Sequence, residues 1–118
     1  MALTQITDYQ VQYSANKFPP RIWLKNGATY IGQLVFMPDG AALPADGQSG
    51  GQVNLYYHLE DFENAFRLLS EEKIAYLLYS GSGPGFENGI QTSAEPLGNA
   101  AEMFEFNPHA APGERASP

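Results

Sequence analysis

Two serines and a histidine are the residues with which this chain could build a nucleophilic reaction. Ser80 and Ser82 lie in a glycine-rich segment, and His58 could act as their general base. A second histidine, His109, lies close to the C-terminus. The serines do not match the Gly-x-Ser-x-Gly elbow, because glycine occupies neither position 78 nor position 80. A serine hydrolase therefore ranks last among the functions considered, and the sequence assigns no catalytic residue.

His58, Glu60 and Asp61 place an imidazole beside two carboxylates, which is the donor chemistry of a metal or acid-base site. The two acids are better explained as the start of a helix, whose positive end stabilises carboxylates. The chain has no cysteine and only two histidines, so it offers too few strong zinc ligands. The sequence predicts no metal site and no cofactor.

Aromatic side chains are the most informative part of the composition, because they make up 13% of the chain. Many must be core residues. Neighbouring tyrosines on a strand point to opposite faces, so some rings must face away from the core. Such rings could line a groove, stack on a ligand or bury against another subunit. The candidate binding residues are Trp23, Tyr30, Tyr56, Tyr57, Tyr76 and Tyr79.

A basic group could instead bind phosphates. Lys17, Arg21 and Lys25 cluster beside Trp23, where an aromatic ring could stack on the bases of single-stranded nucleic acid. The overall charge opposes this function, because 13 acidic against 6 basic residues leave a formal net charge of -7. Nucleic acid is therefore the second hypothesis.

One segment resembles a known motif. The run Leu-Lys-Asn-Gly-Ala-Thr-Tyr-Ile-Gly-Gln-Leu at residues 24–34 is similar to the first motif of Sm-like RNA-binding proteins. The matching positions are Leu24, Asn26, Gly27, Gly32 and Leu34. The resemblance covers under a tenth of the chain, and it implies a ring-forming protein that binds RNA.

The candidate residues must be positioned by a β-rich fold. The Asn-Gly pair at 26–27 lies between strand-forming residues and predicts a hairpin with a type I′ turn. Pairing outward from that turn sets Trp23 opposite Tyr30. It also places Leu34 and Phe36 on the face of Trp23.

The rest of the chain alternates between strand and helix patterns. An N-terminal strand at 6–13 is expected to join the sheet, and further strands are expected at 53–59, 74–80 and 89–95. Apolar residues at helical spacing predict one amphipathic helix of about three turns, starting near Glu60. The fold class is mainly β with one α-helix, in the order β-β-β-loop-β-α-β-β. This order suits a small bent sheet or a partly open barrel, either OB-like or SH3-like.

Length and composition indicate one globular domain at residues 1–97 of the 118-residue chain. It contains a long loop at 38–52, and connections of this length are usually functional or disordered, with disorder favoured here. Residues 98–118 are expected to form a flexible tail, with Met103–Phe106 as a docking or edge-strand segment. No apolar run approaches the ~20 residues of a membrane-spanning helix. The N-terminus lacks the basic cluster of a secretory signal, so a cytoplasmic location is expected.

No motif specifies a reaction or a ligand. We therefore expect an acidic, non-enzymatic β-barrel domain that binds a protein partner or associates with itself as a homo-oligomer. The alternatives are a single-stranded nucleic-acid-binding domain, Sm-like or OB-like, and a small serine-dependent hydrolase. No membrane partner is expected.

Overall fold

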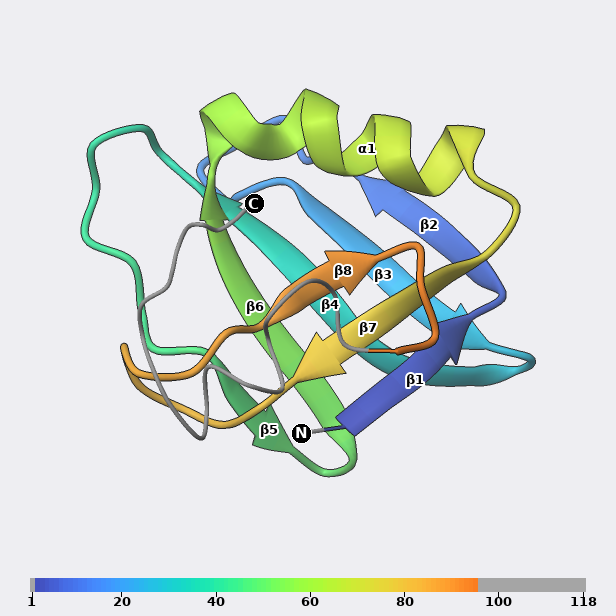
Figure 1. Cartoon of the computed structure of the whole chain (residues 1–118). Helices are drawn as coiled ribbons and strands as arrows, with labels where there is room; N and C mark the ends of the chain where they lie inside the picture. Colours follow the sequence, from blue (N-terminus) through green and yellow to red (C-terminus); the bar gives the residue numbers. More distant parts are fainter. Residues whose placement is uncertain (1, 96–118) are drawn as a thin grey trace.

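The computed structural model describes residues 2–95, which form strands and one α-helix (Figure 1). The strands are β1 (Ala2–Ile6), β2 (Asp8–Gln12), β3 (Arg21–Asn26), β4 (Thr29–Met37), β5 (Gly47–Ser49), β6 (Gln52–His58), β7 (Ala75–Tyr79) and β8 (Gly89–Gln91). A 3₁₀ turn (Leu59–Asp61) leads from β6 into the helix α1 (Phe62–Glu71). The predicted class, mainly β with the helix between its later strands, is confirmed.

The strands form two open sheets. The large sheet has the order β2-β3-β4-β6-β5, and the small sheet, β1-β7-β8, lies in front of it in Figure 1. Neither sheet closes on itself, so the bent-sheet form of the expected fold is the one observed. Neighbouring strands are antiparallel except β4 and β6, which run parallel.

The expected N-terminal strand at 6–13 corresponds to β2 in the large sheet, and it is preceded by β1, a strand of the small sheet that the sequence did not predict. The chain passes between the sheets at Thr7, whose backbone N–H donates a hydrogen bond of 2.8 Å to the carbonyl of Lys25. The Thr7 hydroxyl accepts a bond of 2.7 Å from the N–H of Gly27. Contacts with the β3–β4 hairpin thus hold the point at which the chain passes from β1 to β2.

The core lies between the sheets and beneath α1. Its fully buried side chains come from the large sheet, and they are Ile22, Leu24, Leu34, Phe36 and Leu55. The small sheet contributes Leu77, and α1 contributes Ala65 and Leu69. Because Ala65 and Leu69 are four residues apart, they lie on one face of α1, which confirms the predicted amphipathic helix.

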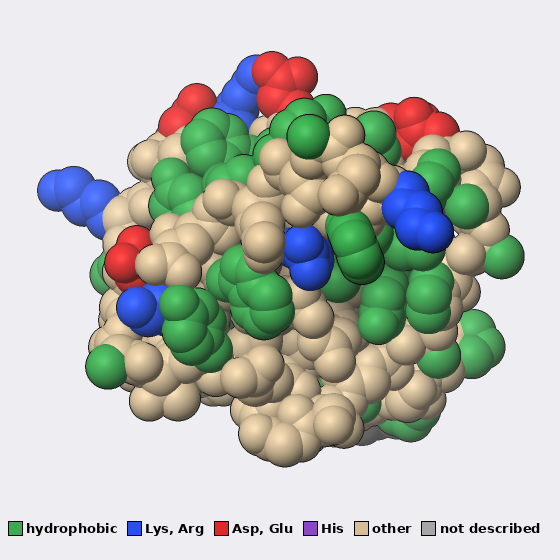
Figure 2. All heavy atoms as spheres, turned by 180° about the vertical axis from the view of Figure 1, so that it is seen from behind, with side chains coloured by type: hydrophobic (Ala, Val, Ile, Leu, Met, Phe, Trp, Pro, Cys, Tyr) green, Lys and Arg blue, Asp and Glu red, His purple; other side chains and the backbone are tan. Residues whose placement is uncertain are grey.

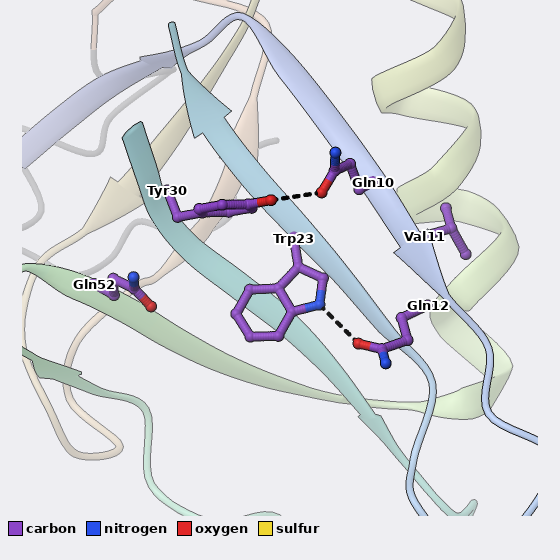
Figure 3. A pocket seen from close by; sticks show the side chains of 6 residues that line it. All are labelled: Gln10, Val11, Gln12, Trp23, Tyr30 and Gln52. Carbon is purple, nitrogen blue, oxygen red and sulfur yellow. Dashed lines mark hydrogen bonds between the residues drawn. The ribbon is translucent and has the colours of Figure 1, made fainter. Parts of the chain in front are cut away.

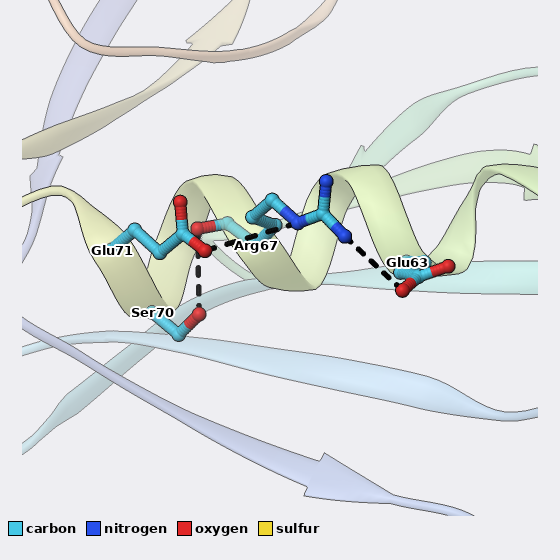
Figure 4. Close-up of polar contacts among 4 residues, drawn as sticks. All are labelled: Glu63, Arg67, Ser70 and Glu71. Carbon is cyan, nitrogen blue, oxygen red and sulfur yellow. Dashed lines mark hydrogen bonds and ion pairs between the residues drawn. The ribbon is translucent and has the colours of Figure 1, made fainter.

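The exposed side of α1 is charged (Figure 4). Arg67 contacts Glu63 at 3.2 Å and Glu71 at 3.8 Å, one helical turn away in each direction. The Ser70 hydroxyl donates a bond of 3.3 Å to the carbonyl of Arg67. Exposed pairs at this spacing contribute only about 0.3–0.5 kcal/mol each. Their main consequence is that part of the acidic charge of the chain resides on the helix.

The hairpin forms as predicted, but its register was wrong. Asn26 pairs with Thr29, so the two-residue loop is Gly27-Ala28, with Gly27 at φ +62°. The register also shifts at Ile31, because Lys25 pairs with Tyr30 and Leu24 pairs with Gly32. This irregularity is a β-bulge, in which the bulged strand carries one extra residue.

The altered register changes which residues share a face. Trp23 lies opposite Gln33 instead of Tyr30, and Leu34 lies opposite Ile22. Leu34 and Phe36 therefore turn into the core, although the sequence had placed them beside Trp23. A slip of one residue moves a whole strand's side chains to the other face, so core burial selects the register.

Gly32 allows β4 and β6 to approach each other. A Cβ atom at this position would overlap the backbone carbonyl oxygen of Val53 and would lie 3.3 Å from Cδ2 of Leu77. Gly32 is buried, and its φ angle is not in the left-handed region. The position thus requires glycine for space between strands, not for backbone conformation.

The long loop at 38–52 is held against the rest of the structure, contrary to the expected disorder. It contains β5, and the Asp39 carboxylate accepts a bond of 2.8 Å from the N–H of Glu60. His58 Nε2 donates 2.7 Å to the carbonyl of Ala41. Asp46 accepts 3.0 Å from the N–H of Tyr56. Polar side chains, which a hydrophobicity pattern does not register, anchor this loop.

The last strand is shorter than expected. It ends at Gln91, whose Nε2 donates to the carbonyls of Ser93, at 2.8 Å, and Glu95, at 2.9 Å. The end of the proposed domain at 97, the tail at 98–118 and the Met103–Phe106 segment lie outside the described residues. Within residues 2–95, no helix has the length and apolar character needed to cross a membrane.

Candidate functional site

The large sheet has one face toward the core and one away from it, called here the outer face. On β3, Ile22 and Leu24 are fully buried, so Arg21, Trp23 and Lys25 point to the outer face. Cross-strand pairing extends this face in both directions. Further members on the neighbouring strands are Asp8, Gln10, Gln12, Tyr30, Gln33, Val35, Gln52, Asn54 and Tyr56.

The outer face differs in charge from the chain as a whole. Asp8 is the only acidic residue in the strands of the large sheet. Figure 2 shows the molecule from this side, with hydrophobic and basic side chains sharing the face and acidic side chains at its margins. An acidic protein therefore presents a face rich in amides, aromatic rings and cations.

Trp23 and Tyr30 form the centre of this face (Figure 3). Their rings meet edge to face, with centroids 6.0 Å apart and planes at 77°. Nε1 of Trp23 donates 3.1 Å to Oε1 of Gln12, and the Tyr30 hydroxyl donates 2.8 Å to Oε1 of Gln10. The bulge that separates Tyr30 from Trp23 in register still leaves the two rings in contact.

A shallow hollow opens beside these rings, with a volume of about 680 Å³. Its lining residues are Gln10, Val11, Gln12, Trp23, Tyr30 and Gln52. The bonds to the rings use the oxygens of Gln10 and Gln12, so their Nε2 groups can donate to a ligand. The hollow thus combines fixed aromatic surface with amide donors, a combination suited to binding rather than to bond cleavage.

Of the three predicted basic residues, two reach the outer face. Lys25 Nζ lies 5.1 Å from the centroid of the Tyr30 ring, within the range of a cation–π contact. Arg21 is half-buried, and its Nη2 donates 3.4 Å to the Ser14 hydroxyl. Its Nε is buried and has no hydrogen-bond partner within residues 2–95. Lys17 lies in the segment between β2 and β3, outside the sheet.

The predicted set of tyrosines does not form one surface. Tyr56 lies on the outer face and lines a second hollow of about 450 Å³, together with loop residues 43–46 and 83–84. Tyr57 and Tyr79 pack against the core, and Tyr57 also lines a hollow of about 340 Å³ beside α1. Tyr76 is in the small sheet, where it pairs with Gln5 and Gln91. As predicted, the two tyrosines of each neighbouring pair point to opposite faces of their strand. The four rings therefore lie on several different surfaces.

Tyr57 has a structural environment. Its ring stacks on Phe36, with centroids 5.6 Å apart. Burial of the hydroxyl, with the nearby charges of Asp46 and Asp61, raises the pKa of Tyr57 to about 12. The phenol therefore stays neutral at physiological pH and contributes to packing.

The residues of the hydrolase hypothesis are not brought together. His58 Nε2 is engaged with the carbonyl of Ala41, and within the described residues no hydrogen bond joins His58 to Ser80 or Ser82. The Ser80 hydroxyl is buried and has no partner within the same residues. A metal site is not assembled either, since no group of three or more His, Asp or Glu side chains in residues 2–95 could hold an ion.

Gln10 and Gln12 are the residues of the candidate site that the sequence did not reveal. Both are exposed on β2, and each fixes one ring of the central pair. Neither glutamine belongs to a recognisable sequence motif. The one signal was that they alternate with Tyr9 and Val11 along the strand, which places both glutamines on the same face. Comparison with known proteins adds no assignment to this site: no protein-family model matches the chain, and neither a curated protein nor a solved structure is similar to it.

Proposed function

We propose that this protein is a non-enzymatic binding module that receives a protein partner on the outer face of its large sheet. The observation that supports this proposal is the Trp23–Tyr30 pair, held by Gln12 and Gln10 beside a hollow. Protein interfaces are enriched in tryptophan, tyrosine and arginine and depleted in acids at their centres. The outer face has this composition.

Preorganisation of the rings favours binding. A side chain that is already fixed by a hydrogen bond loses less conformational freedom on association, and each ordered side chain otherwise costs about 0.5–1.5 kcal/mol. Trp23 and Tyr30 are both fixed in this way in the isolated chain. We expect them to be the residues whose truncation costs the most affinity.

The proposal is tested by substituting Trp23 and recovering bound proteins. Trp23→Ala should weaken the binding of any specific partner by at least about 30-fold, the effect of a central interface residue. The matched control is Ile74→Ala, which shortens an exposed hydrophobic residue outside the large sheet. Equal recovery of the same partners by the wild type, Trp23→Ala and Ile74→Ala would show that the outer face is not the binding site.

Single-stranded nucleic acid is the second candidate, favoured by one specific contact. Lys25 lies over the Tyr30 ring, and Arg21 shares the same face, so cations and stacking rings are adjacent. The chain has one tryptophan, so quenching of Trp23 fluorescence by an oligonucleotide reports on this face. Binding must weaken as salt rises. No quenching at low salt, or an affinity that salt does not change, eliminates nucleic acid.

Two narrower expectations belong with this proposal. A homo-oligomeric state and a cytoplasmic location remain predictions from the sequence.

A serine hydrolase ranks last among the proposed functions, because the His58 imidazole is hydrogen-bonded to the carbonyl of Ala41 in the long loop. Any hydrolytic activity that survived in a His58→Ala variant would exclude the mechanism built on that histidine.

A further inference from the structure

The strand β2 leaves one edge of the large sheet unpaired. It pairs with β3 on one side and is the first strand of the sheet, so its other side has no strand neighbour within residues 2–95. Four of its five residues are exposed. It contains no proline, no lysine and no bulge, three of the devices that usually protect an edge. Its one charged residue is Asp8, whose Oδ1 accepts 2.8 Å from the N–H of Tyr9.

The core-side surface of β2 is apolar and incompletely covered. Tyr9 packs on Phe66 of α1, with centroids 6.0 Å apart, and Tyr13 contacts Phe62 at 6.3 Å. Between them Val11 is 44% exposed, while Tyr13 is 69% and Phe66 is 37% exposed. The hydrophobic layer of the large sheet therefore continues to the edge and ends in solvent.

The other edges are less suited to pairing. β5 and β8 have three residues each, too short for an extended ladder. β1 has five residues, as β2 does, but none of its residues is among the large hydrophobic side chains that are exposed. Only β2 combines sufficient length with an uncovered apolar side.

We propose that a second copy of this chain pairs antiparallel with β2 about a two-fold axis at Gln10. This inference rests on the proposed function, because Gln10 and Gln12 also line the hollow. In that register Tyr9 lies opposite Val11 of the second copy, and Gln10 lies opposite its own equivalent. Asp8 lies opposite Gln12. Apolar residues thus continue the core side of the sheet and polar residues continue the outer face, because antiparallel neighbours share a face.

Charge is complementary in this register. In the backbone register of its own chain, Asp8 lies opposite Lys25, and Gln12 lies opposite Arg21. In the dimer Asp8 lies beside Gln12 of the second copy. Asp8, the only acidic residue of β2 and β3, then lies between Lys25 of its own chain and Arg21 of the second copy on the outer face. No like charges lie opposite one another across the two-fold axis. Each copy still carries a net charge of -7, so salt should strengthen the association by screening the rest of the surface.

The pairing also gives the hollow a defined neighbour. Gln10 and Gln12 stand between Trp23 and the free edge, so in the dimer the two hollows adjoin across the axis. The partner contributes its own Gln10 and Gln12 to the same continuous surface. Trp23 fluorescence should therefore change on dilution, as the copies separate.

The test is the solution mass of the full chain by sedimentation over a wide range of concentration. We expect twice the monomer mass at high concentration, and Val11→Lys should raise the dissociation constant at least tenfold, because a charge at a strand edge opposes pairing. Leu43→Lys is the matched control, since Leu43 is 41% exposed and outside the strands. A monomer at every concentration, or equal weakening by both variants, overturns the pairing.

Two further measurements keep the test independent of folding defects in Val11→Lys. Tyr13 lies just beyond the end of β2, and Tyr13→Lys should also raise the dissociation constant of the dimer. Amide exchange at residues 8–12 should slow as concentration rises, and exchange independent of concentration overturns the pairing. A monomer that still captures another protein through Trp23 overturns the pairing and leaves the proposed function intact. A monomer without such capture overturns both.

Discussion

Nε1 of Trp23 on β3 donates a hydrogen bond of 3.1 Å to Oε1 of Gln12 on β2. The two side chains are diagonal neighbours on the outer face. Gln12 is the cross-strand neighbour of Arg21, and Gln10 is that of Trp23. The contact therefore ties the edge strand β2 to the ring at the centre of the face. It links the unpaired edge to the aromatic hollow, the two features from which a binding role is proposed.

Removing the Gln12 side chain should release the Trp23 ring without unfolding the protein. In Gln12→Ala we expect more efficient acrylamide quenching and a red-shifted emission, because the ring loses its hydrogen-bond partner and becomes more exposed. Stability should change by about 1 kcal/mol or less, as for one exposed hydrogen bond. Gln48→Ala, on the opposite edge strand, is the control. Unchanged quenching in Gln12→Ala would mean that this bond does not hold the ring.

Gly32→Ala should destabilise the fold by roughly 1–3 kcal/mol, the range for overpacking. The added methyl group would meet the Val53 carbonyl, a backbone atom that cannot move without separating β4 from β6. Chemical denaturation measures the loss. Gly47→Ala is the matched control, because a Cβ there meets nothing within 4 Å, and its change should stay within about 0.5 kcal/mol. Equal stabilities of the two variants would contradict a close approach at Gly32.

The buried hydroxyl of Tyr57 should make stability fall in alkaline solution. Its pKa is about 12 in the folded chain against 10.0 for the ordinary group. The unfolded chain therefore releases this proton first, and between pH 10 and 12 it binds fewer protons than the folded chain. The contribution of Tyr57 is complete below pH 10 and is lost as the pH rises to about 12, by on the order of 2 kcal/mol.

Denaturant unfolding on both sides of pH 10 measures this loss. Tyr57→Phe keeps the stacking on Phe36 and removes the proton, so its stability should decline less than that of the wild type over the same range. Tyr76→Phe, in the small sheet, controls for the loss of a tyrosine hydroxyl as such. Parallel decline of the wild type and Tyr57→Phe would assign the alkaline instability to other groups.

Asp46 should prove to be the residue that joins the long loop to the loop between β7 and β8. Its carboxylate accepts from the N–H of Tyr56 and from Nδ2 of Asn88, each at 3.0 Å. Asn88 in turn accepts 2.7 Å from the N–H of Ser80. Asp46→Ala leaves part-buried donors without an acceptor, which costs about 1–3 kcal/mol.

Amide exchange measures this effect locally. We expect the Tyr56 and Ser80 amides to exchange faster in Asp46→Ala than in the wild type. Glu87→Ala removes the same charge from an exposed position of the second loop and should leave both amides unchanged. Accelerated exchange in both variants would indicate an effect of charge, not of the hydrogen bonds of Asp46.

Local pattern predicted much of the fold. Phe62, Ala65 and Leu69 recur at the helical period, and α1 forms there with Ala65 and Leu69 buried. The strand at 52–58 follows from the alternation of Val53 and Leu55 with polar residues. These elements were predictable because a residue's own period determines which of its neighbours share a face.

The candidate site was only partly predictable. Trp23 and Tyr30 were predicted as binding residues. Their rings are in contact, across a bulge that the Asn-Gly pair at 26–27 did not indicate. Gln10 and Gln12 were missed, because their role arises from contacts 11 and 20 residues away in the chain. Such contacts depend on which strands become neighbours, and composition does not specify this.

The amino-acid sequence by itself determined the local elements: the hairpin, the amphipathic helix, the order of strands around it and the surplus of strand aromatics. Only the tertiary structure decided that β1 and β2 belong to different sheets, that β4 and β6 run parallel, and that Trp23 lies on the outer face while Phe36 faces the core. The physical reason is that alternation defines two faces of a strand without choosing between them. The choice comes from burying the largest apolar area, which depends on all strands together.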